Sequence, residues 1–251
     1  MFGWFVKGAT SRVKTTRYPA RDETALGVTP GRPVETTCDN ELLAVDLAAT
    51  CPTDAIKPAS FKTTVDISRC VHCMACTRGE NTMRWQMDYR WARWVGNDAG
   101  RAARHRPFQK SLHIRVVDTG SCDAVISEIK QLAKPYYNMH RLGFFITPTP
   151  RHADVLMVTG PVTSPMRLAL LKTYAAMPEP KWVIAVGNCA ISGCVFAPSF
   201  IANGSVADVI PVDVHVPGCP PPPLAILHGL LLLTGRETEM QPIDQPLGGP
   251  P

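Results

Sequence analysis

A run of three cysteines at three-residue intervals has the spacing of a metal-binding loop. The run consists of Cys70, Cys73 and Cys76, and a fourth cysteine, Cys51, opens the sequence C-P-T-D-A-I upstream of it. Thiolates are soft ligands that bind iron and zinc in proteins. Four of them suffice for one tetrahedral zinc ion or for one iron–sulfur cluster.

The spacing favours the iron–sulfur cluster. In bacterial ferredoxins the repeat is C-x2-C-x2-C-x3-C-P, and the fourth cysteine of one repeat ligates the cluster begun by the other repeat. By this rule Cys51 completes the site of the later three cysteines and forms one [4Fe–4S] site with them. The positions of the second ferredoxin cluster carry other residues: Glu41, Ala44, Leu47 and Glu80. This segment is therefore typical of a two-cluster ferredoxin reduced to one cluster.

Zinc remains an alternative for the same thiols, because C-x-x-C pairs also bind it. A zinc ribbon, however, needs neither the C-P-T-D-A-I sequence nor a third cysteine at the same interval. Disulfides are disfavoured by composition. Nine cysteines in 251 residues are too few for a disulfide scaffold of this length, and their clustering indicates metal ligation in a reducing compartment. Cys38 is interpreted as a remnant of the lost cluster.

The first residues and the hydropathy indicate where the protein works. The start of the chain has no signal-peptide h-region, and the apolar run at 224–233 is far shorter than the roughly 20 residues that a membrane helix needs. We therefore expect a cytoplasmic protein without a membrane span. The net charge of +5 lies mainly in the first 110 positions, and charge alone does not choose between an acidic partner subunit, anionic lipid and nucleic acid.

Changes in residue composition and hydrophobic pattern divide the chain into four parts. Residues 1–83 combine a basic amphipathic docking arm with a one-cluster ferredoxin-like α+β domain. Residues 84–110 form a Trp- and Arg-rich connector, which we interpret as an exposed protein-binding surface rather than a nucleic-acid-binding one. Residues 111–236 form an α/β domain, and residues 237–251 a Pro/Gly-rich tail.

The third part alternates short apolar strands with helical stretches, which predicts a mainly parallel sheet covered on both faces. We expect strands at 112–117, 144–146, 155–159, 182–187 and 210–214. We expect helices at 123–134, 164–177 and 222–234.

Three further cysteines follow three of these strands. Cys122 follows the strand at 112–117, Cys189 the strand at 182–187, and Cys219 the strand at 210–214. Because ligands of such sheets bind at the carboxyl ends of the strands, we predict that the three thiols share a second metal site. The alternative is that they are small buried core residues, which suits any one of them better than all three.

Residues 111–236 resemble the small, cluster-bearing subunit of membrane-bound [NiFe] hydrogenases and formate hydrogenlyase, and its relative in respiratory complex I. The resemblance rests on G-S-C at 120–122, P-R-H-A-D at 150–154, G-N-C-A-I-S-G at 187–193 and P-G-C-P-P at 217–221. Residues 1–83 are similar to the polyferredoxin subunit of the same enzymes. The resemblance implies a fusion of two electron-carrying subunits, a flavodoxin-like second part and a second [4Fe–4S] cluster.

One ligand of the family pattern is missing. Hydrogenase-type relatives have a second cysteine where this chain has Val125, and the complex I type has it where this chain has Asp123. Two residues are candidate replacements: Cys194, which stands at a family glycine position, and Asp123, through oxygen. We favour Cys194 because thiolate is the usual cluster ligand. A cluster that is altered, held by three cysteines or absent stays an open alternative.

Histidines near these motifs are interpreted as ordinary polar residues rather than ligands. His72 lies between two cysteines of the first site, and His152 lies in the P-R-H-A-D turn. Arg151 and His152 are nevertheless candidates for hydrogen bonds that tune the second cluster.

The resemblance implies an electron-transfer subunit of a membrane-associated, complex I-like or group 4 [NiFe] hydrogenase-like oxidoreductase, with no catalytic acid, base or nucleophile of its own. The implied partners are a large catalytic subunit, membrane-arm subunits, and a ferredoxin or formate dehydrogenase-type electron donor, with no nucleic acid. They would hold the chain at the inner face of the cell membrane. The alternatives are a structural adaptor with a degenerate or missing second cluster, and a nucleic-acid-binding zinc protein.

Overall fold

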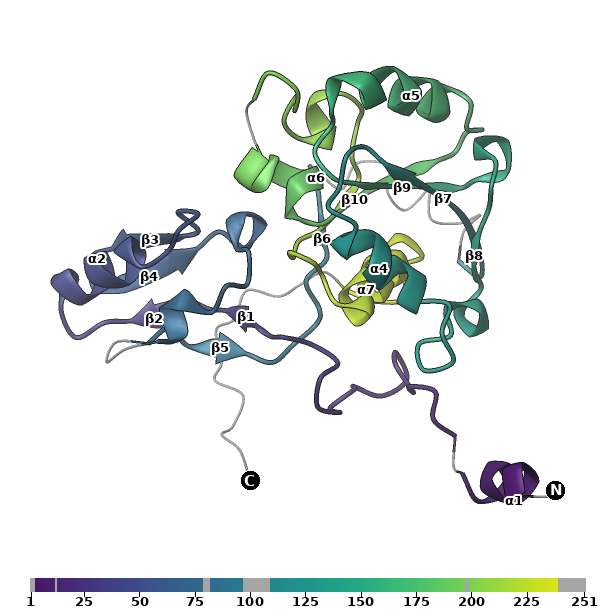
Figure 1. Cartoon of the computed structure of the whole chain (residues 1–251), viewed down its shortest axis with the longest axis horizontal. Coiled ribbons are helices and arrows are strands. Elements are labelled where there is room, and N and C mark those ends of the chain that lie inside the picture. The colour runs from purple at the N-terminus through teal and green to yellow at the C-terminus, as the bar shows by residue number, and fades with distance from the viewer. Residues whose placement is uncertain (1–2, 12, 79–81, 97–108, 197–198, 239–251) are drawn as a thin grey trace.

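The structure, a computed structural model, describes residues 3–11, 13–78, 82–96, 109–196 and 199–238. Its largest element is a six-stranded, mainly parallel sheet (Figure 1). The strands of this sheet are β6 (Arg93–Trp94), β7 (Leu112–Asp118), β8 (Phe144–Ile146), β9 (Val155–Thr159), β10 (Trp182–Val186) and β11 (Val214–Val216).

The strand order is that of a flavodoxin-like sheet. Along the sheet the strands lie in the order β6-β11-β10-β9-β7-β8. Counted along the chain from β7, the five parallel strands therefore have the order 2-1-3-4-5, which is the flavodoxin-like arrangement. Only β6 runs antiparallel to its neighbour, β11. The predicted α/β architecture with a mainly parallel sheet is confirmed.

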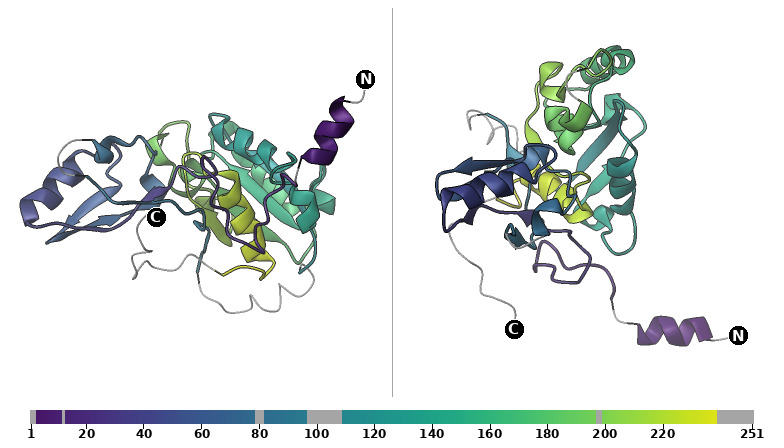
Figure 2. Two further views of the ribbon diagram at one scale, coloured as in Figure 1. Left: turned by 90° about the horizontal axis from the view of Figure 1, so that it is seen from below. Right: turned by 60° about the vertical axis from the view of Figure 1, so that its left-hand side comes forward.

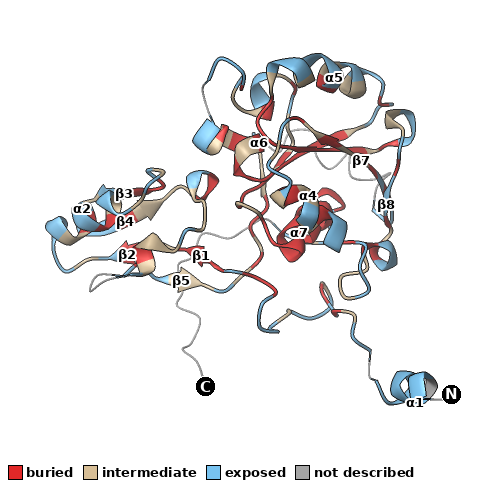
Figure 3. Ribbon diagram, in the orientation of Figure 1, coloured by how far each residue is buried: buried red, intermediate tan, exposed pale blue. Residues whose placement is uncertain are grey.

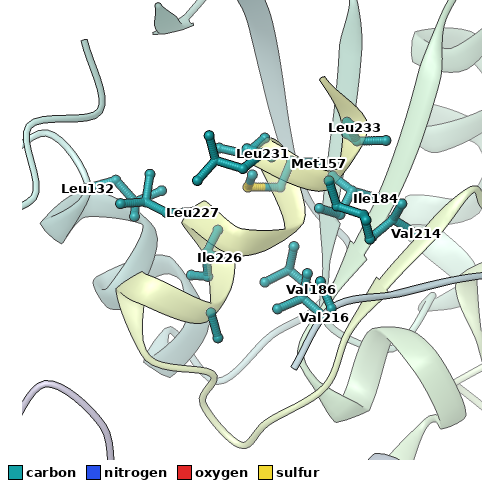
Figure 4. Close-up of a cluster of buried hydrophobic side chains, with 14 of the residues drawn as sticks. Leu132, Met157, Ile184, Val186, Val214, Val216, Ile226, Leu227, Leu231 and Leu233 are labelled. Carbon is teal, nitrogen blue, oxygen red and sulfur yellow. The ribbon is translucent and has the colours of Figure 1, made fainter. Parts of the chain in front are cut away.

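Helices cover both faces of this sheet. They are α4 (Ala124–Gln131), α5 (Ser164–Ala175), α6 (Asn188–Ser192) and α7 (Pro223–Leu233). One core packs α4 and α7 against Ile184 and Val186, and the other packs α5 and α6 against Val183 and Ala185. Because neighbouring strand residues point into different cores, β10 is apolar at every position. All residues of α7 are buried (Figure 3), and Figure 4 shows Ile226, Leu227 and Leu231 of this helix among the buried apolar side chains of the core.

A smaller unit precedes this sheet in the chain. Its three-stranded antiparallel sheet has the order β2-β4-β3, and a two-stranded pair, β1-β5, lies beside it (Figure 1). The elements are β1 (Arg32–Pro33), β2 (Thr36–Thr37), α2 (Glu41–Ala49), β3 (Ile56–Ala59), β4 (Lys62–Val65) and β5 (Trp85–Gln86). The stretch at 19–37 is rich in proline and glycine, which favours an extended loop, but it contributes the two short strands β1 and β2.

The last strand of the large sheet lies further along the chain than predicted. The expected strand at 210–214 is wrong, since β11 spans Val214–Val216. Pro211 lacks the N–H that a ladder needs, and Ile210 is buried in the core beneath α5 and α6 instead. The Asp213 carboxylate accepts a hydrogen bond from the Val183 N–H at 2.9 Å, so this residue borders the strand rather than continuing it.

The tryptophans of the connector belong to the core, so their interpretation as an exposed binding surface is wrong. Trp91 is fully buried. Trp94 lies in β6 and packs against Trp182 with 5.5 Å between ring centroids. The large apolar rings gain more from burial than from exposure, and they attach the connector to the sheet edge. The remainder of the connector, at 97–108, lies outside the described residues.

The N-terminal arm forms a short helix, α1 (Gly3–Thr10), which stands apart from both sheets (Figure 2). Its Trp4 side chain is 77% exposed, and Lys7 lies in its last turn. Among the described residues, no helix has the length and apolar character that crossing a bilayer requires.

His228 on α7 is a buried histidine whose two nitrogens are both used. Its Nδ1 accepts from the Ala92 N–H at 3.1 Å, and its Nε2 lies 2.9 Å from the Thr238 carbonyl oxygen. A carbonyl only accepts, so Nε2 carries the proton and the ring is neutral. Burial lowers the pKa of His228 from 6.5 to about 4.

Acid is therefore expected to destabilise the fold through His228. The unfolded chain takes up a proton near pH 6.5 and the folded chain only near pH 4, so stability falls across this window, by up to about 3 kcal/mol. In His228→Asn the amide oxygen keeps the acceptor for Ala92 and does not titrate. Denaturant unfolding at several pH values should show that the free energy of unfolding falls less steeply with falling pH in the variant than in the wild type. Equal slopes in both proteins would contradict the assignment.

Candidate metal centres

The four cysteines of the first predicted site line one pocket. Cys51 follows α2, Cys70 ends the short helix η1 (Ile67–Arg69), and Cys76 lies in η2 (Ala75–Thr77), with Cys73 between the last two. The pocket holds about 330 Å³ of empty space, part of it open to solvent, and its other walls include Ile56 and Trp85. The structure thus brings together the four residues that the ferredoxin spacing selected; their role as ligands stays a prediction.

The loop between these cysteines turns sharply at each interval. His72 and Met74 both have left-handed backbone conformations, with φ of +53° and +59°. Non-glycine residues adopt this region rarely, and such strain is concentrated at functional sites. The tight turns allow three thiols within seven residues to line the same pocket.

Burial, with a smaller contribution from the neighbouring thiols, favours the protonated form of Cys70 and Cys76. Burial raises the pKa of Cys70 to about 11, and the thiols of Cys76, Cys51 and Cys73 add to the increase. Burial alone would also raise the pKa of Cys51, but hydrogen bonds from Thr53 and Ala55 outweigh it and lower that pKa. The Ala55 N–H donates to the Cys51 sulfur at 3.3 Å. Metal binding at this site would therefore release protons.

A single zinc ion and a cluster place different demands on the spacing of these four thiols. Zinc requires every thiolate at about 2.3 Å from one centre. In the described part of the chain, no three His, Cys, Asp or Glu side chains converge in the way that a single ion requires. A cluster distributes its ligands over several iron atoms, so its thiolates stand further apart, as around a pocket.

Three thiols meet at the carboxyl edge of the large sheet. Cys189 lies in α6 directly after β10, Cys194 begins η6 (Cys194–Phe196), and Cys219 follows β11. Interaction among these three side chains lowers the pKa of Cys194 and raises the pKa values of Cys189 and Cys219. Cys122 is exposed. Its electrostatic interaction with Cys189 and Cys219 contributes to the raised pKa values of those two thiols.

Cys194 rather than Asp123 lies with this group. The Asp123 residue precedes α4 in a left-handed conformation, and its backbone carbonyl accepts a hydrogen bond from the Ser127 N–H. This residue is exposed. Cys194 has a φ of +48°, in the region that favours glycine. Cys194 therefore occupies a backbone conformation typical of glycine; its role as the fourth ligand stays a prediction.

The other sequence-selected residues lie away from the thiols. Arg151 and His152 are exposed in η5 (Pro150–His152), which precedes β9 and so lies at its amino end. The thiols lie at the carboxyl ends of the strands, about 13–17 Å away for a strand of this length. The suggestion that these two side chains donate hydrogen bonds to the second cluster is therefore wrong.

His72 and Cys38 also lie outside the pocket lining. The His72 ring stacks on Trp91, with 5.4 Å between centroids, and contacts Trp85 edge-on. Burial lowers its pKa. Cys38 is half-buried and packs against the small core of the first unit. Neither side chain lines the pocket of the four cysteines.

The two groups of cysteines are neighbours, which the sequence did not indicate. A pocket with about 520 Å³ of empty space, partly open to solvent, is lined from one side by 52–54 and Arg69 and from the other by Cys194 and Val195. The Ser192 hydroxyl donates to the Ser68 carbonyl at 3.0 Å across the same contact. The charge of Cys70 contributes to the raised pKa of Cys219. The two sites therefore lie on opposite sides of one interface, which is formed by α6 and by the loop that carries Cys70, Cys73 and Cys76.

The second half of the chain is similar to several known proteins. Residues 122–233 match the family described as NADH ubiquinone oxidoreductase, 20 Kd subunit. A probable membrane-bound hydrogenase subunit, mbhJ of Pyrococcus furiosus, is 44% identical over 124 residues, which are 49% of this chain and 74% of that protein. An uncharacterized protein of Methanocaldococcus jannaschii is 41% identical over 133 residues, or 53% and 89% of the two chains. Formate hydrogenlyase subunit 7 of Escherichia coli is 37% identical, and the match spans 52% of this chain and 51% of that protein.

Proposed function

The chain belongs to the NADH ubiquinone oxidoreductase 20 Kd subunit family, and from this membership we propose that it is an electron-transfer subunit of a complex I-like or group 4 [NiFe] hydrogenase-like oxidoreductase. The observation that carries the proposal is the adjacency of two cysteine sets, one around the first pocket and one at the carboxyl edge of the large sheet. Relatives described as hydrogenase and formate hydrogenlyase subunits support the same role.

Residues 1–83 are proposed to be a ferredoxin-like domain with one cluster, and residues 111–236 the small-subunit-like domain. Within the first, three of the four ligand positions of the lost cluster, Glu41, Ala44 and Leu47, lie in α2; the fourth, Glu80, lies outside the described residues. Asn40 caps this helix through a 2.8 Å hydrogen bond to the Leu43 N–H, and Ala44 and Leu47 are buried. An apolar helix face thus replaces a cluster in supporting the small sheet.

The proposed ligands are Cys51, Cys70, Cys73 and Cys76 for the first [4Fe–4S] cluster. Those for the second are Cys122, Cys189, Cys194 and Cys219. When bound, such clusters supply one-electron transfer at potentials set by burial and by hydrogen bonds to sulfur. In this chain, Thr53 and Ala55 donate to the Cys51 sulfur, which favours the reduced state there. No catalytic residue is assigned to this chain.

The proposed partners follow from the same membership. A large hydrogenase-like subunit would carry the catalytic centre, membrane-arm subunits would hold the complex at the inner face of the membrane, and a ferredoxin or formate dehydrogenase-type protein would exchange electrons with it. The name of the Pyrococcus furiosus relative, a membrane-bound hydrogenase subunit, supports this peripheral location.

Iron and acid-labile sulfide should be counted on anaerobically purified protein. We expect roughly eight iron atoms per chain, four for each [4Fe–4S] cluster, and Cys51→Ser should remove one cluster. Cys38→Ser is the matched control, because this thiol does not line the pocket, and it should keep both clusters. One cluster in the wild type would favour the structural adaptor, and colourless, iron-free protein would overturn the proposal.

A further inference from the structure

One buried side chain, that of Asn188, joins the two cysteine loops. It begins α6 directly before Cys189 and is 1% exposed. Its Nδ2 donates to the carbonyl oxygen of Ile67 at 2.9 Å and to that of Cys70 at 2.6 Å. Its Oδ1 accepts from the Gly218 N–H at 2.7 Å, and Gly218 immediately precedes Cys219.

The orientation of this carboxamide is determined by its partners. Two carbonyl oxygens can only accept and one N–H can only donate, so the NH₂ group must face the Cys70 loop and the oxygen must face Gly218. The backbone N–H of Asn188 also donates to the Gly218 carbonyl at 3.0 Å. All hydrogen-bonding groups of the side chain are therefore used, as a buried amide requires.

These contacts make a short bonded connection between the two proposed cluster sites. From Cys70 it runs through the carbonyl group of that residue and one hydrogen bond to the Asn188 carboxamide. From Asn188 it continues through one peptide bond to Cys189. The same carboxamide, through Gly218, also fixes the segment that carries Cys219.

We propose that Asn188 is the positioning residue that couples the two clusters: its carboxamide holds the Cys70 loop against the segments of Cys189 and Cys219 and connects them for electron transfer. The proposal rests on the proposed function, in which each cysteine set holds a cluster. The Ser192 bond to Ser68 crosses the same interface and adds to its rigidity. Asn188 differs from it in bonding directly to the backbone of a proposed ligand.

The test compares Asn188→Asp and Asn188→Leu with the wild type. The aspartate keeps an oxygen for the Gly218 N–H but turns a second oxygen toward two carbonyls, whereas the leucine loses all three hydrogen bonds. Asn40→Asp is the matched control, since it makes the same amide-to-carboxylate change at an exposed helix cap, where aspartate is an equally good cap. Iron content, the EPR spectrum of the fully reduced protein and rapid-freeze EPR after photoreduction are measured for each.

In the wild type and in Asn40→Asp we expect magnetic interaction between the two reduced clusters and fast electron exchange. In Asn188→Asp we expect both clusters to be present with loss of that interaction and slower exchange. The leucine variant should show the larger loss. Two clusters with unchanged interaction in both variants, or loss of a whole cluster from both, would overturn the coupling role. Iron-free wild-type protein would instead overturn the proposed function.

Discussion

Replacement of Cys194 by serine is expected to abolish the EPR signal of the second cluster and to leave that of the first at full intensity. The Cys194 side chain interacts with those of Cys189 and Cys219, so it lies where a shared cluster would be held. A serine hydroxyl is a hard, weakly acidic donor and replaces a thiolate poorly at iron. EPR of the dithionite-reduced protein, with an iron count, measures the loss.

The glycine variant at the same position separates a ligand from a structural residue. Cys194 has a φ of +48°, which costs a non-glycine residue about 1–2 kcal/mol. Cys194→Gly should lose the second cluster and also remove this strain. The cluster-free variant should therefore have a free energy of unfolding at least as large as that of the cluster-free wild type. A second signal that survives in both the serine and the glycine variants would exclude Cys194 as a ligand and favour Asp123.

The grouping of the cysteines could be predicted because it depends on local rules. Spacing along the chain is enough to select Cys51 and the three cysteines of the later loop. The parallel sheet then brings the ends of β10 and β11 together, and with them Cys189 and Cys219. These predictions needed only the strand periodicity and the common direction of parallel strands.

The contacts between distant segments could not be predicted in this way. Asn188 bonds to residues 118 and 121 positions away in sequence, and nothing in the motif G-N-C indicates such partners. The burial of Trp91 likewise depends on β6 joining the edge of the sheet next to β11, a strand more than a hundred residues later. Arg151 and His152 lie before β9, at its amino end, and the motif P-R-H-A-D does not by itself indicate at which edge of the sheet its residues lie.

Gly160→Ala is expected to lower the free energy of unfolding by about 3 kcal/mol or more, the combined cost of a left-handed alanine and of overpacking. Gly160 follows β9 with a φ of +79°, and a Cβ atom there would lie 2.5 Å from the Ser121 nitrogen and 2.8 Å from the Gly120 carbonyl carbon. These are backbone atoms, which cannot rotate away as a side chain does. Chemical denaturation under anaerobic conditions gives the change.

The same substitution should also reduce occupancy of the second cluster, because the displaced backbone leads directly into Cys122. Gly27→Ala is the matched control. Its φ of +84° is nearly the same, but a Cβ atom there would meet nothing within 4 Å, so only the conformational cost of about 1–2 kcal/mol applies. The difference in free energy of unfolding between the two variants gives the cost of the contact between residue 160, after β9, and the backbone of 120–121, which leads to Cys122. Equal destabilisation with full iron content in both would show that this loop moves aside freely, and a ligand on such a loop would not hold a cluster in a fixed position.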